Sequence, residues 1–349
     1  QTHVFDCPLD FLQPELIRFR RPPADESELD RAAHLFKTAK KPLIVAGGGV
    51  LYSQACDELR DFAETYGIPV AETHGGKSSL PWDHPLNVGG IGVDGGPAAN
   101  ALAAESDVVL AIGTRLQDFT TGSHALFPQA KLLSLNVQSF DAAKWHSAPM
   151  VADARVGLTQ LRAAIGEWKA DVTWTKHAKT LAATWLERVT ELTTHVPDNV
   201  LPYDAEVIGA VRDSLNDQHG DSGKKDVVVC AAGTLPAELH KLWRASSPGN
   251  YHVEYGFSCM GYEIAGALGA KMARPDQEVI VMVGDGSYMM MNSEIATSVL
   301  LGKKLIIVVL DNRGYGCINR LQNASGTPSF NNMLADCVPE GGSSGQIDF

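Results

Sequence analysis

The chain has 349 residues, of which 44% are hydrophobic and 20% charged, and its formal net charge is −12. The composition is ordinary for a globular protein. The length exceeds the roughly 250–300 residues at which one hydrophobic core stops growing, so we expect two domains. The acidic balance argues against nucleic acid or an anionic membrane as a partner. Because the six cysteines show no C-x-x-C spacing and no apolar run approaches the roughly 20 residues of a membrane helix, we expect a cytoplasmic protein.

The first half of the sequence alternates helical patterns with short apolar runs. Residues 1–25 lack periodicity, and we interpret them as a linker from an upstream domain. Residues 26–38 have helical spacing, and residues 42–46 form an apolar run that stops at Gly47-Gly48-Gly49. The other predicted elements are a helix over about 54–66 and strands over 68–71, 107–112 and 131–136. This alternation predicts a Rossmann-like α/β domain with a parallel sheet over residues 26–165.

The second half repeats this alternation after a helical connection over residues 166–200. We predict strands over 226–230, 278–283 and 304–310, and helices over 238–243, 260–272 and 292–301. Residues 260–272 are small and apolar on all sides, which predicts a buried helix. The fold class is therefore α/β, with two doubly wound parallel-sheet domains. We expect the second domain, residues 201–349, to be truncated at its C-terminal end.

Two strand ends of the second domain hold the residues with the clearest chemistry. Gly284-Asp285-Gly286-Ser287 follows one strand, and Asn312 follows the next strand 27 positions after Asp285. Ligands bind beyond the carboxyl ends of parallel strands, and successive strand ends can lie side by side. The amides of Gly286 and Ser287 could donate to a phosphate. Asp285, Asn312 and the Gly314 carbonyl, with two diphosphate oxygens and a water, would complete the octahedron that Mg²⁺ prefers.

The second domain resembles thiamine diphosphate enzymes in its Gly284-Asp285-Gly286 run followed by Asn312 at a strand end. Here Asp311-Asn312 stands in place of the usual Asn-Asn pair, and the changed residue, Asp311, is at the position that does not bind the metal in that family. The resemblance implies that thiamine diphosphate and Mg²⁺ are the cofactors. The further cofactor contacts it implies are Gly233 and Thr234 on the diphosphate, Met260 beneath the cofactor, and the Ser258 carbonyl as acceptor for the aminopyrimidine.

The upstream α/β domain resembles the central domain of the same family, which binds FAD in some members and is a scaffold in others. Gly47-Gly48-Gly49 does not form the G-x-G-x-x-G pattern with an acidic partner that a dinucleotide needs. FAD therefore stays an open but less favoured cofactor.

Within the family, the runs 284–322 and 254–263 are similar to the hydrolases that open a cyclic 1,2-diketone in inositol breakdown. This similarity implies cleavage of the bond between two carbonyl carbons with water, yielding 5-deoxyglucuronate. Asn319 and Arg320 follow the metal loop and are the candidates for contacting the ring hydroxyls of the substrate. An acetolactate synthase-like carboligase, a 2-keto acid decarboxylase and a non-catalytic truncated remnant stay open as alternatives.

One residue that the family requires is not assigned in this sequence. Thiamine diphosphate enzymes use a Glu in a separate pyrimidine-binding domain to activate the cofactor, and we expect that domain to lie upstream of residue 1. The resemblance also implies that each site forms between two subunits. We therefore expect a homodimer or homotetramer assembled through the thiamine sites, and no turnover by these 349 residues alone.

Overall fold

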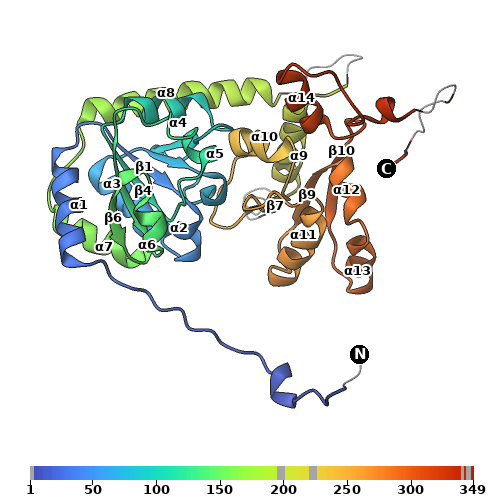
Figure 1. Cartoon of the computed structure of the whole chain (residues 1–349), viewed down its shortest axis with the longest axis horizontal. Coiled ribbons are helices and arrows are strands. Elements are labelled where there is room, and N and C mark those ends of the chain that lie inside the picture. The colour runs from blue at the N-terminus through green and yellow to red at the C-terminus, as the bar shows by residue number, and fades with distance from the viewer. Residues whose placement is uncertain (1–3, 195–200, 220–225, 339–341, 343–346) are drawn as a thin grey trace.

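The computed structural model describes residues 4–194, 201–219, 226–338, 342 and 347–349. It contains two α/β units, with an extended N-terminal segment leading away from the first (Figure 1). One sheet has the strand order β3-β2-β1-β4-β5-β6 and the other β10-β9-β7-β8, and all of the described strand pairs are parallel. The prediction of an α/β protein with two parallel sheets is confirmed.

The first unit contains the elements before residue 166. Its strands are β1 (Pro42–Ala46), β2 (Val70–Glu72), β3 (Asn87–Gly90), β4 (Val108–Ile112), β5 (Lys131–Asn136) and β6 (Ala148–Val151). Its helices are α1 (Glu26–Thr38), α2 (Gly48–Tyr52), α3 (Cys56–Tyr66), α4 (Pro97–Glu105), α5 (Asp118–Thr121), α6 (Ser139–Ala142) and α7 (Ala154–Ile165). The predicted helix 26–38 and strands 42–46 and 131–136 are confirmed, whereas β2 lies two residues later at its start than predicted.

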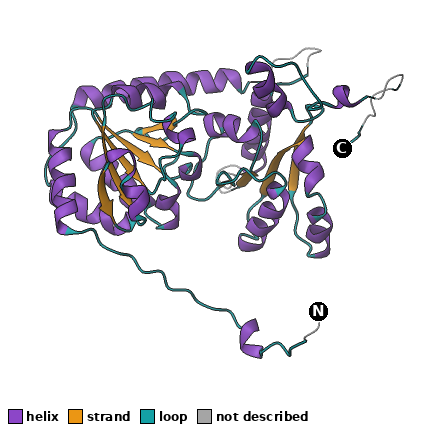
Figure 2. Cartoon of the chain, viewed as in Figure 1, coloured by secondary structure: helices purple, strands orange, loops and turns teal. Residues whose placement is uncertain are grey.

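Both faces of the first sheet are buried by helices (Figure 2). Alternate residues of a strand point to opposite faces. Ile44 and Leu110 accordingly pack with α1, α3 and α7, whereas Leu43 and Val109 pack with α4 and the long helix α8 (Val172–Leu192). This two-sided burial explains why the strands are apolar runs and not alternating sequences.

The second unit is built on four strands. They are β7 (Val227–Cys230), β8 (Tyr251–Val253), β9 (Val279–Gly284) and β10 (Ile306–Leu310). Its helices are α9 (Asp204–His219), α10 (Leu235–Leu242), α11 (Tyr262–Ala273), α12 (Asp285–Met290), α13 (Glu294–Leu300) and α14 (Gly316–Ala324). The three predicted strands are present within two residues of their expected limits. Short elements such as β8 and α12 were not predicted, because Gly and polar residues interrupt their apolar pattern.

Helix α8 (Val172–Leu192) connects the two units. Trp174 and Ala178, near its start, lie in the core of the first unit, and the Trp174 indole donates a hydrogen bond of 2.8 Å to the Pro42 carbonyl. Val189, near its end, lies in the core of the second unit with Ile208. The predicted helical connection over 166–200 is thus present over α8, whereas residues 195–200 lie outside the described residues. The predicted domain limits at residues 25, 165 and 200 stay predictions.

The prediction that residues 260–272 form a helix buried on all sides is wrong. In α11, Ile264, Ala267 and Leu268 are buried, but Met272 is 55% exposed. The helix packs on β7 and β9 and also contacts α12 and α13, whereas Tyr262, Ala265, Gly269 and Met272 are exposed. Because these exposed residues are also small or apolar, the sequence pattern alone does not distinguish this side from a buried one.

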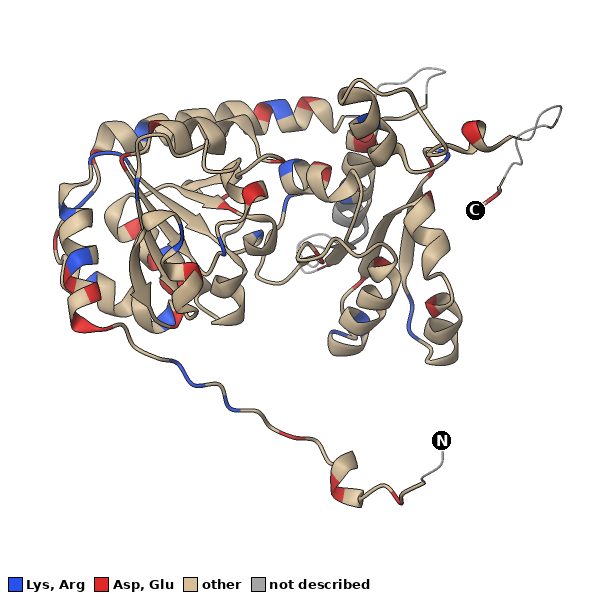
Figure 3. Cartoon of the chain, in the orientation of Figure 1, with Lys and Arg blue, Asp and Glu red and all other residues tan. Residues whose placement is uncertain are grey.

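Charged residues lie mainly on helices and loops (Figure 3). Of the described strands, only β2 and β5 contain Asp, Glu, Lys or Arg, namely Glu72 and Lys131. Lys131 is exposed, whereas Glu72 is only 2% exposed. Glu72 is therefore a charged group placed inside the fold, and it needs a specific partner there.

Gly76 should not tolerate a side chain. A Cβ at this position would lie 2.0 Å from the Ala46 carbonyl oxygen, whereas a Cβ at the adjacent Gly75 would have its nearest neighbours at 3.7 Å. We expect Gly76→Ala to lower the free energy of unfolding by about 1–3 kcal/mol or more through overpacking, and Gly75→Ala to change it little. Urea denaturation of both variants measures this, and equal stabilities would contradict the packing described here.

Candidate cofactor site

The two strand ends predicted to form a metal site lie side by side. β9 and β10 are parallel neighbours, and Gly284 is paired with Leu310. Asp285 therefore follows one strand at the level where Asp311 and Asn312 follow the other. β7 flanks β9 on its other side, which brings the loop after β7 to the same edge of the sheet.

Asp285 is buried, with 3% exposure, at the start of α12. Its Oδ2 accepts a hydrogen bond of 2.7 Å from the Gly314 amide. Its Oδ1 is buried and has no hydrogen-bond partner among the described residues. Burial, together with the charge of Asp311, raises the pKa of the Asp285 carboxyl. A buried carboxylate oxygen without a donor is costly, and a bound cation would satisfy it, so this residue fits the predicted metal.

The other two predicted metal ligands lie in the loop after β10. Asn312 is exposed, and its Oδ1 accepts a hydrogen bond of 3.3 Å from the Gly316 amide. Gly314 approaches Asp285 through its amide. The described residues contain no group of three His, Cys, Asp or Glu side chains that could hold a metal. The predicted set is of another kind, with one carboxylate, one side-chain amide oxygen and one peptide carbonyl, and Mg²⁺ binding by it stays a prediction.

The predicted diphosphate loop connects β7 to α10. Gly233 has a φ of +83°, a conformation that favours glycine. Thr234 is the N-cap residue of α10, and its hydroxyl accepts a hydrogen bond from the Arg320 guanidinium. Arg320, predicted to contact substrate, thus lies against the diphosphate loop. The side-chain oxygen of the neighbouring Asn319 is buried without a partner among the described residues. Roles of both in substrate binding stay predictions.

Met260, predicted to support the cofactor, lies beside the Gly-Asp-Gly run. A Cβ at Gly286 would be 3.7 Å from the Met260 methyl carbon and 2.7 Å from the Tyr315 ring. Gly286 is therefore needed for the packing of Tyr315. Ser258 lies on an exposed loop with a φ of +54°. The Glu254 carboxylate holds this loop by accepting hydrogen bonds from the amides of residues 257 (3.0 Å) and 259 (2.6 Å).

Glu263 is a buried residue of this region that the sequence reasoning left without a role. Its carboxylate accepts hydrogen bonds from the Ser287 hydroxyl at 2.8 and 2.9 Å and from the Gly261 amide at 3.0 Å. The Ser287 side chain, in a residue predicted to bind the cofactor, therefore points to Glu263, and its amide is the group left for a phosphate. The available signal was an acidic residue among the small and apolar residues at the start of the helix.

A stack of three rings joins the two units close to the Ser258 loop. The His74 ring lies between those of His240 and Tyr255, with centroid distances of 4.0 and 3.8 Å. The Tyr255 hydroxyl donates a hydrogen bond of 2.7 Å to Asp94. Burial lowers the pKa of both histidines, that of His240 to well below its usual range, so both are neutral at pH 7. Contacts with His74 and Asp94 of the first unit thus fix the position of Tyr255, three residues before Ser258.

A cavity of about 600 Å³ lies at the carboxyl ends of β1 and β4, where the strand order of the first sheet reverses, and Glu254, Tyr255 and Tyr262 of the second unit also line it. Such a position binds dinucleotides in related folds. The glycines that line it have a packing explanation, because a Cβ at Gly47 or Gly49 would lie within 2.6 Å of Gly113. Close contact between two strand ends therefore accounts for Gly47 and Gly49, whereas a Cβ at Gly48 would lie 3.1 Å from the Gly75 carbonyl oxygen. FAD binding stays an untested alternative.

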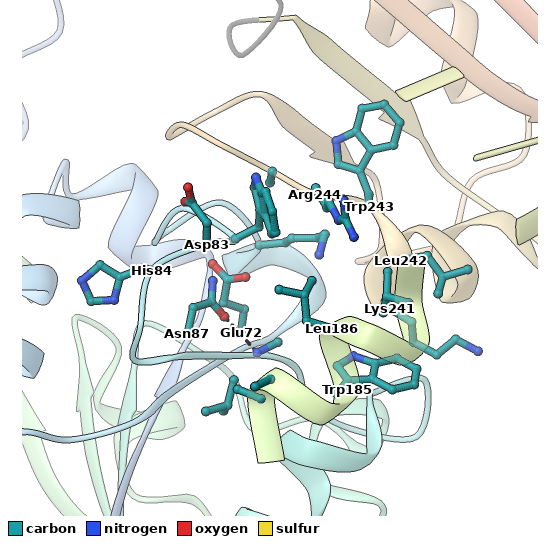
Figure 4. Close-up of a pocket in the computed structure, with 18 of the residues that line it drawn as sticks. Glu72, Asp83, His84, Asn87, Trp185, Leu186, Lys241, Leu242, Trp243 and Arg244 are labelled. Carbon is teal, nitrogen blue, oxygen red and sulfur yellow. Dashed lines mark hydrogen bonds between the residues drawn. The ribbon is translucent and has the colours of Figure 1, made fainter. Parts of the chain in front are cut away.

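A separate cavity of about 250 Å³ lies between the two units (Figure 4). Figure 4 shows Trp185 and Leu186 of α8, Trp243 and Arg244 after α10, and Glu72 of β2 around it. Of the residues that the structure describes, none of the predicted cofactor-binding ones lines this cavity. Buried Lys77 lies at its wall and donates a hydrogen bond of 2.9 Å to the His240 carbonyl. This cavity is therefore part of the interface between the two units.

Comparison with known proteins agrees with this geometry. Residues 29–161 match the family described as thiamine pyrophosphate enzyme, central domain, and residues 231–340 match the thiamine pyrophosphate enzyme, C-terminal TPP binding domain. The chain therefore belongs to the thiamine pyrophosphate enzymes and contains these two domains.

Three similar curated proteins have the same name. The chain is 41% identical over 351 residues to the 3D-(3,5/4)-trihydroxycyclohexane-1,2-dione hydrolase of Geobacillus thermodenitrificans. It is 39% identical over 349 residues to that of Bacillus anthracis and 38% identical over 358 residues to that of Clostridium tetani. Each comparison covers 95% of this chain and 54% of the relative. The chain thus spans about half the length of the curated relatives it matches.

None of the helices in the described part of the chain is long and apolar enough to span a membrane.

Proposed function

We propose that this chain supplies the scaffold and the diphosphate-binding half of a thiamine diphosphate- and Mg²⁺-dependent hydrolase. The reaction would be the opening of 3D-(3,5/4)-trihydroxycyclohexane-1,2-dione to 5-deoxy-D-glucuronate by cleavage of a carbon–carbon bond. The observation that carries the proposal is Asp285, whose buried Oδ1 lacks a partner among the described residues at the strand edge where the predicted cofactor residues converge. The relatives' shared name supports the choice of substrate.

The residues of the chain would act by binding and orientation. Asp285, Asn312 and Gly314 would hold Mg²⁺, and the amides of the Gly233-Thr234 and Gly286-Ser287 runs would donate to the diphosphate. Met260 would support the cofactor from below, and the Ser258 carbonyl would accept a hydrogen bond from the aminopyrimidine. Once bound, thiamine diphosphate supplies the nucleophilic carbon and accepts the electron pair of the broken bond. Asn319 and Arg320 are the candidates for orienting the ring hydroxyls.

The proposal includes assembly as a homodimer or homotetramer through the thiamine sites. Val299 and Leu300 on α13 are 74% and 84% exposed, and Met289 and Met290 on α12 are about half exposed. Apolar side chains gathered on neighbouring helices support a protein interface on this side of the second unit.

The test is an assay of the full-length gene product with the cyclic dione and, in parallel, with pyruvate. Ring opening that requires both thiamine diphosphate and Mg²⁺ is the expected result. Pyruvate consumption without dione hydrolysis would instead identify a carboligase or decarboxylase. Cofactor binding without turnover of either substrate would indicate a non-catalytic protein, and both outcomes would overturn the proposal.

A further inference from the structure

A single buried carboxylate joins the three segments that are predicted to surround the cofactor. Glu263 is the second residue of α11 and is 1% exposed. Its Oε1 accepts a hydrogen bond of 2.9 Å from the Ser287 hydroxyl and one of 3.4 Å from the Ala232 amide. Its Oε2 accepts from the same hydroxyl at 2.8 Å and from the Gly261 amide at 3.0 Å.

Each donor belongs to a different part of the predicted site. Ala232 precedes Gly233 and Thr234 in the diphosphate loop, Gly261 follows Met260, and Ser287 ends the Gly284–Ser287 run beside the metal ligand Asp285. The Gly261 amide also donates to the Ser287 hydroxyl oxygen at 2.7 Å. The carboxylate and the hydroxyl thus form one closed network beneath all three segments.

The chemistry of the network requires a carboxylate. No lysine or arginine of the described residues forms an ion pair with Glu263, so hydrogen-bond donors alone compensate its charge. Hydrogen bonds to an ionised acceptor are stronger than neutral ones and fix the direction of their donors. Two acceptor oxygens are needed because the Ala232 and Gly261 amides approach opposite oxygens. A glutamine side chain has only one acceptor oxygen, so it can accept a hydrogen bond from only one of these two amides in the same geometry.

We infer that Glu263 is a positioning residue that fixes the diphosphate loop, the segment after Met260 and the Gly-Asp-Gly turn relative to one another. It does so through the Ala232 amide, the Gly261 amide and the Ser287 hydroxyl. This inference rests on the proposed function, because it is thiamine diphosphate that these segments would hold. Glu263 itself would not contact the cofactor, and its effect would pass through the donors it orients.

The test compares Glu263→Gln, Ser287→Ala and Glu294→Gln in the full-length gene product. Glu294→Gln is the control, since it makes the same chemical change on α13 of the same unit. Calorimetry measures the affinity for thiamine diphosphate with Mg²⁺, and hydrogen exchange of the cofactor-free protein measures the protection of the Ala232 and Gly261 amides. We expect Glu263→Gln to weaken cofactor binding by about 10–100-fold, the range of a lost hydrogen bond to a charged group, and Glu294→Gln to leave it unchanged.

The exchange measurement separates positioning from a general loss of stability. A protein destabilised throughout would lose protection in β7 and β9 as well. The inference instead requires faster exchange at the Ala232 amide, while β7, β9 and the Gly261 amide, which also donates to Ser287, stay protected. If Glu263→Gln does not fold, Ser287→Ala decides, and we expect it to weaken binding by about 3–10-fold. Wild-type affinity in the folded variants would overturn the inference. Failure of the wild-type protein itself to bind thiamine diphosphate would overturn the proposed function. Unchanged exchange at the Ala232 amide in Glu263→Gln would separately contradict the positioning role of Glu263.

Discussion

Replacing Asp285 with alanine is expected to abolish Mg²⁺-dependent binding of thiamine diphosphate. The Asp285 carboxylate is the one buried acid among the three predicted metal ligands, and its Oδ1 is free of other partners within the described part of the chain. Loss of residues that merely support a metal ligand costs about 10–100-fold in metal affinity, so loss of the ligand should cost at least that. Calorimetry with thiamine diphosphate, with and without Mg²⁺, measures the effect.

Asp311→Ala is the matched control for this substitution. Asp311 is exposed and forms an ion pair of 3.0 Å with Arg313, and it occupies the position of the motif that is not predicted to bind the metal. We expect this variant to keep most of the cofactor affinity. Binding that survives Asp285→Ala, or that is lost equally in both variants, would contradict the predicted metal site.

The second large effect is expected at Lys77, which is 5% exposed and whose positive charge acts on the buried Glu72 carboxyl. Burial raises the pKa of Glu72, and the positive charge of Lys77 opposes that shift. Lys77→Met removes that opposing charge and the hydrogen bond to the His240 carbonyl, and a hydrogen bond of a charged group contributes about 1.5–3 kcal/mol. We therefore expect Lys77→Met to lower the free energy of unfolding by about this amount at pH 8, as measured by urea denaturation.

The loss should depend on pH in a defined direction. Without Lys77, the folded-state pKa of Glu72 is raised further above its unfolded value. A group with a raised pKa contributes stability below its unfolded pKa, and this contribution is lost as the pH rises through the folded pKa. The destabilisation should therefore be smaller at pH 5 than at pH 8. Lys179→Met, an exposed lysine at the same cavity, is the control and should change little, and a loss independent of pH would contradict this account.

Much of the fold could be predicted because long apolar runs bounded by glycine are strong signals. The adjacency of the Asp285 and Asn312 loops followed from their spacing, and the pairing of Gly284 with Leu310 confirms it. Strands β3, β6 and β8 were not predictable in this way, since they have three or four residues each and contain Gly, Pro or His. Their positions depend on neighbouring strands that are distant in sequence.

The supporting contacts of the site could not be predicted for a related reason. His74, Asp94, His240 and Tyr255 come from both units, and nothing in their spacing indicates that three rings stack. Glu263 lies in a helix of mainly small and apolar residues, which indicate simple packing. Its partners, Ala232 and Ser287, are defined only after the turns around them have formed.

Helix α8 has a consequence for how the protein unfolds. Its 21 residues span about 31 Å at 1.5 Å per residue, and the two ends of this single rod are built into different hydrophobic cores. Unfolding of either core removes the neighbours against which the α8 side chains pack. A helix that loses half of its packing is marginally stable by itself. The free energies of the two units are therefore linked, and loosening one should lower the melting temperature of the other without any change in its own sequence.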